Sequence, residues 1–186
     1  TLASAGFEAA RQVGLLPEGH RCSALHGHSF TATVFADLPP DFAPYPGGEV
    51  DALRERLKDC VSLLDYSYLN ETLEHPTDEN LARWICRNVG VPGVQRVAIQ
   101  STGTQGVDLD RNSNAHLWRR FRFQAAHQLP NVPPGHKCGR MHGHGFEVIL
   151  HANQDLGCRN IGIDYDHLEA IWAPFQAQLN FNCLNE

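Results

Sequence analysis

Two kinds of hydrophobic pattern alternate along the chain, one with the period of a strand and one with the period of a helix. Segments rich in β-branched and aromatic side chains alternate between apolar and polar positions, which predicts strands over residues 29–36, 94–101, 115–128 and 145–152. Apolar positions spaced along one helix face predict helices over residues 50–62, 78–89 and 164–178. Strands that alternate with helices in this way predict an α+β fold.

Turn-forming residues separate these elements. Prolines and glycines predict a loop over residues 39–48, and residues 103–114 form a turn-rich junction. Thr77 precedes Asp78 and Glu79, and a threonine cap followed by acidic residues suits the exposed amides at the start of a helix. We therefore expect the helix over residues 78–89 to begin just after Thr77.

An internal repeat determines the domain organisation. The segment GHRCSALHGHSF at residues 19–30 recurs as GHKCGRMHGHGF at residues 135–146. Two flanking blocks recur in the same order, FEAAR as FQAAH and LDYSYLNE as LNFNCLNE. Matched blocks in order indicate a tandem duplication. We expect one unit over residues 1–112 and a second over residues 113–186, which stops at the counterpart of Glu71.

The composition argues against a nucleic-acid-binding or membrane-spanning protein. Fifteen Lys and Arg against 21 Asp and Glu give a net charge of −6, which disfavours a nucleic-acid partner. No apolar stretch approaches the ~18 residues of a membrane span. The six cysteines include no CxxC pair and no secretion signal precedes them, so we expect reduced thiols in a cytoplasmic protein. The 11 histidines point toward metal or proton chemistry.

Three histidines of the second unit form a candidate metal site. His142 and His144 are two residues apart in a strand, so their side chains project from the same face. His127 lies on a strand that we expect to run antiparallel to theirs. Three imidazoles with an open fourth position are typical of a catalytic zinc site, and Cys138 would lie beside that position.

These residues also have interpretations other than a catalytic metal site. An HxH pair alone often has no metal, and Cys138 as a fourth ligand would make the zinc structural. We expect His20 and His136, which lie next to glycines, to be loop histidines without a ligand role.

The motifs AAH, CxxxHGH, LDxxxLNE and PTDEN together resemble the 6-pyruvoyl-tetrahydropterin synthase and 6-carboxytetrahydropterin synthase family. The resemblance implies tandem tunnelling-fold (T-fold) units, each a four-stranded antiparallel sheet with two helices on one side. Such units assemble through sheet edges, which implies a homo-oligomer. The resemblance also implies a pterin substrate whose side-chain hydroxyls bind Zn²⁺. It further implies three catalytic or binding features: a cysteine that moves a proton, an Asp-His pair, and a glutamate that holds the pterin.

The metal ligands of that family correspond to His127, His142 and His144 in the second copy. In the first copy they correspond to Arg11, His26 and His28. A guanidinium cannot donate a lone pair to a metal, so we expect one Zn²⁺ per chain. The family's cysteine corresponds to Cys22 and Cys138, of which only Cys138 has three histidines nearby.

The remaining family residues are altered. The Asp-His pair corresponds to Asp65 and Tyr66 in the first copy, and to Asn180 and Phe181 in the second. The glutamate that holds the pterin corresponds to Gln100, which can bind a pterin edge without charge.

The pattern PTxEN resembles a substrate-pocket rim and nominates Thr77 and Glu79 for substrate binding, although helix capping explains them equally well. The complementary losses in the two copies suggest a division of labour. We expect the second copy to supply the metal and Cys138, and the first copy to supply Asp65, Tyr66 and Gln100.

The sequence therefore predicts a zinc-dependent lyase acting on 7,8-dihydroneopterin triphosphate or a related pterin, with a carboxy- or pyruvoyl-pterin product. A resemblance to the queuosine branch would make the product a 7-deazaguanine precursor. Two alternatives remain: a pterin binder without turnover, and a protein with a structural zinc.

Overall fold

The chain forms two compact units, which are described separately. The computed structural model describes residues 1–14, 16, 18–154 and 162–186. Unit 1 comprises Thr1–Trp118 and His151–Ile163, and unit 2 comprises Arg119–Leu150 and Asp164–Glu186. None of the helices in these described ranges is long and apolar enough to cross a lipid bilayer.

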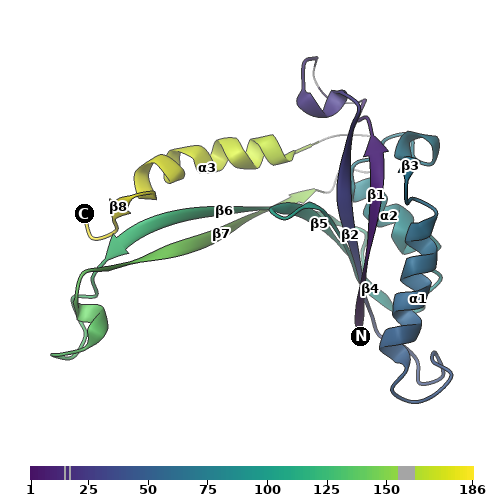
Figure 1. Ribbon diagram of the computed structural model, residues 1–186, viewed down its shortest axis with the longest axis horizontal. Helices are drawn as coiled ribbons and strands as arrows, with labels where there is room; N and C mark the ends of the chain where they lie inside the picture. Colours follow the sequence, from purple (N-terminus) through teal and green to yellow (C-terminus); the bar gives the residue numbers. More distant parts are fainter. Residues whose placement is uncertain (15, 17, 155–161) are drawn as a thin grey trace. The chain divides into compact units, whose positions relative to one another are not determined.

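Unit 1 contains an antiparallel sheet and two helices (Figure 1). The neighbouring strands of the sheet are β1 (Leu2–Arg11), β2 (His26–Ala36), β4 (Val94–Thr102) and β5 (Gln105–Asp110). The short strand β3 (Ser67–Tyr68) runs parallel to the end of β1. The helices are α1 (Glu49–Ser62) and α2 (Asp78–Asn88), and two single turns of 3₁₀-helix are η1 (Arg21–Ser23) and η2 (Leu69–Glu71). Four antiparallel strands and two helices are the content predicted for one T-fold unit.

The two faces of this sheet differ in burial. Along β1, every second residue from Ala3 to Arg11 is buried, and β2 alternates in the same way from Phe30 to Ala36. The buried face packs against α1 and α2, where Leu53, Leu57 and Ile85 are completely buried. The opposite face carries polar side chains, among which Ser4 and Thr33 share a hydrogen bond of 2.8 Å. The period-two pattern in the sequence thus corresponds to one covered and one uncovered face.

Most predicted elements agree with the structure to within a few residues, and helix α2 begins as expected. Thr77 is its N-cap, and its hydroxyl oxygen accepts a hydrogen bond of 3.3 Å from the backbone amide of Asn80. Asp78 lies in the first turn, but its carboxylate is used for contacts outside the helix, as described below.

The prediction of a turn-rich junction over residues 103–114 is wrong for its middle part, because Gln105–Asp110 forms strand β5. The glycines of this segment suggested a turn. Gly106 instead allows two neighbouring strands to approach closely, since a Cβ there would lie 2.5 Å from the backbone oxygen of Ile99 on β4.

Unit 2 repeats the first part of this arrangement. It contains most of β6 (Ala115–His127) and β7 (His142–Gln154), the 3₁₀ turn η3 (Lys137–Gly139), the helix α3 (Tyr165–Leu179), and β8 (Asn182–Cys183) parallel to β6. Its core consists of Phe123, Ala125 and Trp172, against which Phe121 and Phe146 pack. Asp164 and His167 form a reciprocal capping box at the start of α3.

Candidate metal centre and flanking residues

The three histidines predicted as ligands meet at one end of unit 2. His127 is the last residue of β6, and His142 and His144 lie at the start of β7. The ring centroids are 4.5 Å apart for His127 and His142, 5.1 Å for His127 and His144, and 4.9 Å for His142 and His144. Their candidate ligand atoms all lie within 4.8 Å of one another. The structure therefore brings these three side chains together as the sequence predicted.

The hydrogen bonds of these histidines leave nitrogen lone pairs for a cation. The Nδ1 atom of His142 lies 2.7 Å from the backbone oxygen of Arg140. A carbonyl only accepts, so Nδ1 carries the proton and Nε2 keeps its lone pair. The Nε2 atom of His127 is buried and has no hydrogen-bond partner in the described part of the chain.

The charge state of His127 also suits a metal ligand. Burial lowers the pKa of His127, and the neighbouring His142 and His144 lower it further. Neutral imidazoles are the form that binds a metal ion, and three of them with an open position fit Zn²⁺.

Gly143 allows the two ligand-bearing strands to approach. A Cβ at this position would lie 3.3 Å from the backbone oxygen of Ala125, and one at Gly27 in unit 1 would lie 3.1 Å from that of Ala9. Both distances are shorter than ordinary van der Waals contacts. A side chain at either position would therefore crowd the backbone of the neighbouring strand, which favours glycine between the paired histidines.

Cys138 lies on η3, half-buried and as a free thiol. His136 accepts a hydrogen bond of 3.1 Å from the Cys138 amide through Nδ1, and Leu129 donates its amide to the Cys138 backbone oxygen at 2.9 Å. Among the described residues, the group that could hold a metal contains the three histidines and not Cys138.

The corresponding loop of unit 1 has the same construction. His20 Nδ1 accepts from the Cys22 amide at 3.2 Å, and Val13 donates its amide to the Cys22 backbone oxygen at 3.0 Å. His20 and His136 are thus loop histidines, as predicted, and each caps a 3₁₀ turn.

A buried ion pair lies at the corresponding end of unit 1. Arg11, in the position of His127, donates from Nη1 to Asp78 Oδ1 at 2.6 Å and to the Pro76 backbone oxygen at 3.0 Å. Ser101 donates its hydroxyl to the second Asp78 oxygen at 2.7 Å. The Arg11 guanidinium also lies 5.1 Å from the centroid of the Phe30 ring. A permanent cation is therefore fixed where the second copy has an imidazole.

The histidines of unit 1 are correspondingly unsuited to a metal. The His26 and His28 rings are 5.1 Å apart. Burial and then the Arg11 charge lower the pKa of His28 to about 4. A low pKa keeps His28 neutral, but the Arg11 guanidinium beside it has no lone pair to donate and its positive charge repels a cation.

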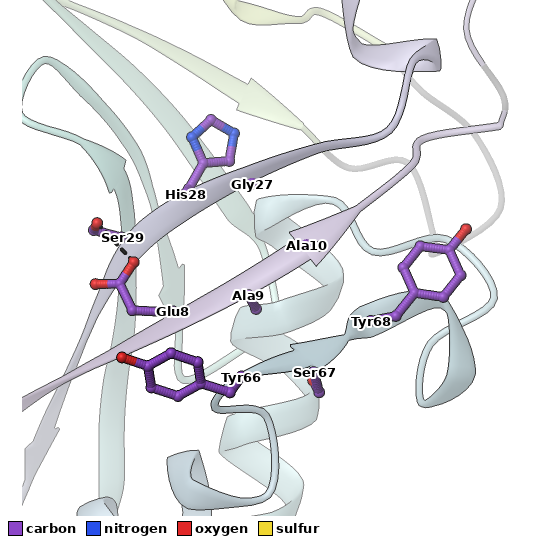
Figure 2. A pocket seen from close by; sticks show the side chains of 9 residues that line it. All are labelled: Glu8, Ala9, Ala10, Gly27, His28, Ser29, Tyr66, Ser67 and Tyr68. Carbon is purple, nitrogen blue, oxygen red and sulfur yellow. Dashed lines mark hydrogen bonds between the residues drawn. The ribbon is translucent and has the colours of Figure 1, made fainter.

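Tyr66 lies beside β1 in unit 1 (Figure 2), and Asp65 directly precedes it in the chain. Asp65 Oδ1 accepts a hydrogen bond of 2.8 Å from the Glu8 amide, and the Tyr66 amide donates to the Glu8 backbone oxygen at 2.6 Å. Tyr66 has a φ of 51° and its side chain is 87% exposed. The Asp65 side chain thus holds the strand edge, whereas the Tyr66 phenol is free to contact a ligand.

The same contacts recur in unit 2 with different side chains. Asn180 Oδ1 accepts from the Gln124 amide at 2.9 Å, and the Phe181 amide donates to the Gln124 backbone oxygen at 2.6 Å. Phe181 has a φ of 58°. An amide oxygen accepts as a carboxylate does, so the Asp-to-Asn difference preserves this contact.

Two asparagines that the sequence analysis did not single out close the ends of the first strands. Asn70 accepts from the Gln12 amide at 2.9 Å and donates to the Gln12 backbone oxygen at 2.8 Å. Asn185 makes the same pair of bonds with Gln128, at 2.8 and 2.9 Å. The signal for both was the repeated LNE segment.

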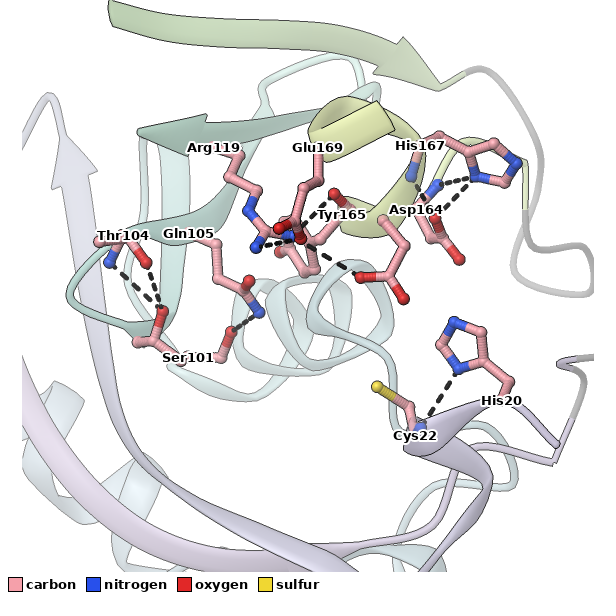
Figure 3. A network of polar contacts seen from close by, with 12 residues as sticks. His20, Cys22, Ser101, Thr104, Gln105, Arg119, Asp164, Tyr165, His167 and Glu169 are labelled. Atoms are coloured by element: carbon pink, nitrogen blue, oxygen red, sulfur yellow. Dashed lines mark hydrogen bonds and ion pairs between the residues drawn. The ribbon is translucent and has the colours of Figure 1, made fainter. Parts of the chain in front are cut away.

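The three predicted substrate-binding residues lie in unit 1. Gln100 is half-buried on β4, where its Cα pairs with those of Thr31 and Gly106. Thr77 caps α2, and burial raises the pKa of the adjacent Glu79. Next to Gln100, the Ser101 hydroxyl that contacts Asp78 also accepts from Gln105 at 3.4 Å (Figure 3).

A family model matches most of this chain, and two known proteins each match about half of it. A family model described as 6-pyruvoyl tetrahydropterin synthase matches residues 3–111 and, in a second segment, residues 116–186. The 6-carboxy-5,6,7,8-tetrahydropterin synthase of Synechocystis sp. is 38% identical over 112 residues, which cover 53% of this chain and 82% of the relative. The structure of Caenorhabditis elegans 6-pyruvoyl tetrahydropterin synthase matches 55% of this chain and 88% of its own, at 18% identity and a TM-score of 0.44. Because the family model accounts for nearly every residue, in two segments that agree with the predicted duplication, the chain belongs to the 6-pyruvoyl tetrahydropterin synthase family.

Proposed function

We propose that the chain is a zinc-dependent lyase that acts on 7,8-dihydroneopterin triphosphate or a related pterin and yields a 6-carboxy- or 6-pyruvoyl-pterin. The observation that carries this proposal is the cluster of His127, His142 and His144, whose ligand atoms lie within 4.8 Å of one another. Membership of the tetrahydropterin synthase family supports the substrate class.

The proposed mechanism assigns each residue a separate task. His127, His142 and His144 would hold Zn²⁺, a Lewis acid that lowers the pKa of substrate hydroxyls. Cys138 would act as general base, since a thiolate is favoured near a cation. The backbone contacts of its loop hold the Cys138 backbone in place.

The other predicted residues complete this proposal. Asp65 and Tyr66 would assist proton transfer, and Gln100, Thr77 and Glu79 would bind the pterin. Tyr66 is exposed and can reach a ligand. A phenol hydroxyl carries a proton that it can donate, so Tyr66 is assigned the role of proton donor.

A second candidate function is pterin binding without turnover. It is favoured by Tyr66, which stands where the family has the histidine of its Asp-His pair, and by Gln100, which stands where the family has a charged glutamate. A protein of this kind would still bind the metal and the pterin.

Phosphate release tests the two candidates directly. The purified chain is incubated with 7,8-dihydroneopterin triphosphate at stoichiometric enzyme, and triphosphate is measured over time. The lyase predicts release that requires the metal and is abolished by His142→Ala. No release from the zinc-loaded chain rejects the lyase and leaves the binder.

We also propose that the chain forms a homo-oligomer through sheet edges. Along β1, the partner strand β3 pairs only with Ala9 and Ala10, which leaves Leu2–Phe7 as an edge with no second strand among the described residues. Such edges favour pairing with another chain. Light scattering at micromolar concentration would give a multiple of the chain mass, and a monomeric mass contradicts this proposal.

A cytoplasmic location is a further part of the proposal. It is supported by the five described cysteines, all of which are free thiols.

A further inference from the structure

Three buried polar side chains of unit 1 form a connected network to which the proposed function assigns no role. They are Arg11 at the end of β1, Asp78 in the first turn of α2 and Ser101 on β4. Asp78 lies at the centre, because Arg11 Nη1 donates to its Oδ1 at 2.6 Å and the Ser101 hydroxyl donates to its Oδ2 at 2.7 Å. We call these three residues the unit 1 network.

The unit 1 network is too deeply buried to contact a ligand directly. Arg11 is 5% exposed, and Asp78 and Ser101 are each 2% exposed. Replacing a buried ion pair with apolar residues often leaves a protein equally stable or more stable, so stability alone does not account for charged side chains here. Buried polar groups of this kind can instead fix the arrangement of the residues around them.

The network is adjacent in the chain to each of the predicted substrate-binding residues. Thr77 and Glu79 flank Asp78, and Gln100 precedes Ser101. The three predicted residues are half-buried, whereas their neighbours in the network are buried. Side chains alternate along a strand, so Gln100 lies on the opposite face of β4 from Ser101. Each accessible candidate is therefore supported by a buried residue next to it.

The start of α2 is fixed on both sides of Thr77. Arg11 Nη1 donates to the Pro76 backbone oxygen at 3.0 Å as well as to the carboxylate that follows Thr77 in the chain. The Asn80 side-chain amide donates to the His75 backbone oxygen at 2.9 Å. Charge-assisted hydrogen bonds are the stronger ones, so the guanidinium holds this segment against the end of β1.

On β4, the Ser101 hydroxyl links the strand to the same carboxylate. It donates to Asp78 and accepts from the Gln105 side-chain amide at 3.4 Å (Figure 3). A displacement of Asp78 would therefore be transmitted to the backbone that carries Gln100. The start of α2 and this part of β4 depend on one carboxylate for their relative position.

The two copies differ in what holds the end of their first strand. In unit 2 the candidate metal ligand His127 occupies the position of Arg11. Unit 1 contains no corresponding group of metal-binding side chains among its described residues. Arg11 supplies a fixed positive charge there, bound to its own carboxylate. The network is thus a feature of the first copy.

We propose that the unit 1 network has a positioning role: it holds the three predicted substrate-binding residues in the arrangement that binds the substrate. This assignment rests on the proposed function, which supplies the substrate and the three binding residues. Misplacing a binding group by roughly 1 Å can cost about 100-fold, so a small displacement is sufficient. Because the candidate metal ligands and Cys138 lie in unit 2, loss of the network is expected to weaken substrate binding and to leave the chemical step unchanged.

The first test removes both charges together, so that neither one is left buried without the other. Arg11→Met combined with Asp78→Leu replaces the ion pair with apolar side chains, and urea unfolding is expected to show stability close to that of the unmodified chain or above it. KM and kcat for triphosphate release from 7,8-dihydroneopterin triphosphate are then measured with the zinc-loaded proteins. KM is expected to rise about tenfold or more with kcat unchanged, the pattern of an interaction lost equally from substrate and transition state.

A second ion pair of unit 1 provides the matched control. Arg54 and Asp51 make a contact of the same 2.6 Å, but both side chains are exposed on α1. Arg54→Met combined with Asp51→Leu is expected to leave KM unchanged. Elemental analysis should give the same zinc content for the unmodified chain and for both double variants.

Ser101→Ala tests the network independently of its charges. The substitution removes one buried hydroxyl, and KM is expected to rise about fivefold, the usual effect of losing one hydrogen bond. Ser101→Thr keeps the hydroxyl and is expected to restore the KM of the unmodified chain.

Three results would overturn the positioning role. The first is an unchanged KM in the folded Arg11→Met, Asp78→Leu variant, and the second is an equal rise in the control pair. The third is a fall in kcat with KM unchanged, which would place the effect on the chemical step. If the double variant does not fold, an unchanged KM in Ser101→Ala overturns the role instead.

Failure of the proposed function gives different results. Triphosphate release that is unaffected by the network variants rejects the positioning role alone. If the zinc-loaded unmodified chain releases nothing, the dissociation constant of the same compound replaces KM and is measured by equilibrium dialysis. Binding that weakens in the Arg11→Met, Asp78→Leu variant then rejects the lyase and supports the positioning role. No binding to the unmodified chain rejects both proposals.

Discussion

The guanidinium of Arg11 lies 2.6 Å from the carboxylate of Asp78, and the two side chains are only 6% and 1% exposed. This pair occupies the end of the first copy that corresponds to the three-histidine cluster of the second. The duplication has thus produced two solutions for the same position: three imidazoles that are half-buried or exposed in unit 2, and a buried permanent cation with its own carboxylate in unit 1. The second solution is complete without a metal ion.

Arg11→Ala is expected to destabilise the chain by roughly 3–5 kcal/mol, because it removes the cation that neutralises the buried Asp78 carboxylate. Urea unfolding followed by circular dichroism measures this change. The double variant Arg11→Ala with Asp78→Ala removes both charges and should be less destabilised than Arg11→Ala alone. A double variant as unstable as the sum of both single variants would show that the pair is not coupled.

Metal content should distinguish the two copies. The unmodified chain is expected to bind one Zn²⁺, measured by elemental analysis after dialysis. His142→Ala removes a ligand of the proposed site and should abolish binding, whereas His26→Ala, its counterpart in unit 1, should leave one ion.

A gain of metal is the converse test. Arg11→His restores a third imidazole, Asp78→Asn removes the buried negative charge that Arg11 neutralises, and the double variant should bind two Zn²⁺ ions. Two ions in the unmodified chain, or none, would contradict the assignment to the second copy.

Asp65 has a structural contact that can be separated from its proposed role in proton transfer. Asp65→Asn keeps an oxygen that accepts from the Glu8 amide, as Asn180 does in unit 2, so stability should change little. Asp65→Ala loses the hydrogen bond and should cost about 1 kcal/mol. Unfolding measurements give both values.

Turnover of the same variants then tests the chemistry. If Asp65 takes part in proton transfer, Asp65→Asn should slow triphosphate release although it remains folded. Unchanged turnover in Asp65→Asn, with turnover abolished in His142→Ala, would restrict Asp65 to its structural contact.

Local patterns in the sequence were sufficient for most of the fold, because each depends on residues close together in the chain. The strands and the cap at Thr77 belong to this class, and the duplication is visible directly as a repeat of sequence. Strand β5 was not predicted, because a glycine can mark either a turn or a place where two backbones approach closely. At Gly106 only the approach of the Ile99 backbone distinguishes the second case from the first. That contact is a tertiary one.

The candidate site likewise has one part that local patterns predicted and one part that they did not. The convergence of His127 with His142 and His144 followed from strand alternation and one short loop. The Arg11 pair with Asp78 joins residues far apart in the chain, and nothing local marks Asp78 as a partner, since an acidic residue after a helix cap has an ordinary role there. The sequence indicated that Arg11 cannot bind a metal but not what neutralises its charge.

A pH-dependent contribution to stability is expected from His116 on β6 in unit 1. Its Nδ1 lies 2.7 Å from Asn153 Oδ1, and its Nε2 lies 3.4 Å from Asp110 Oδ2. Two oxygen acceptors favour the imidazolium, which has two N–H donors. The hydrogen bond to Asn153 raises the pKa of His116 most, burial opposes it, and Asp110 raises it further with a smaller effect from Asp108.

A raised pKa in the folded state means that this contribution is fully present below the unfolded value of about 6.5 and is lost as the pH rises through the folded-state pKa. His116→Gln removes the titrating group. The free energy of unfolding of the unmodified chain should therefore exceed that of the variant by the largest margin below about pH 6.5, and the margin should shrink at higher pH. Urea unfolding of both proteins across this range measures the margin. A difference that stays constant with pH would mean that His116 contributes to stability by packing alone and not through its charge.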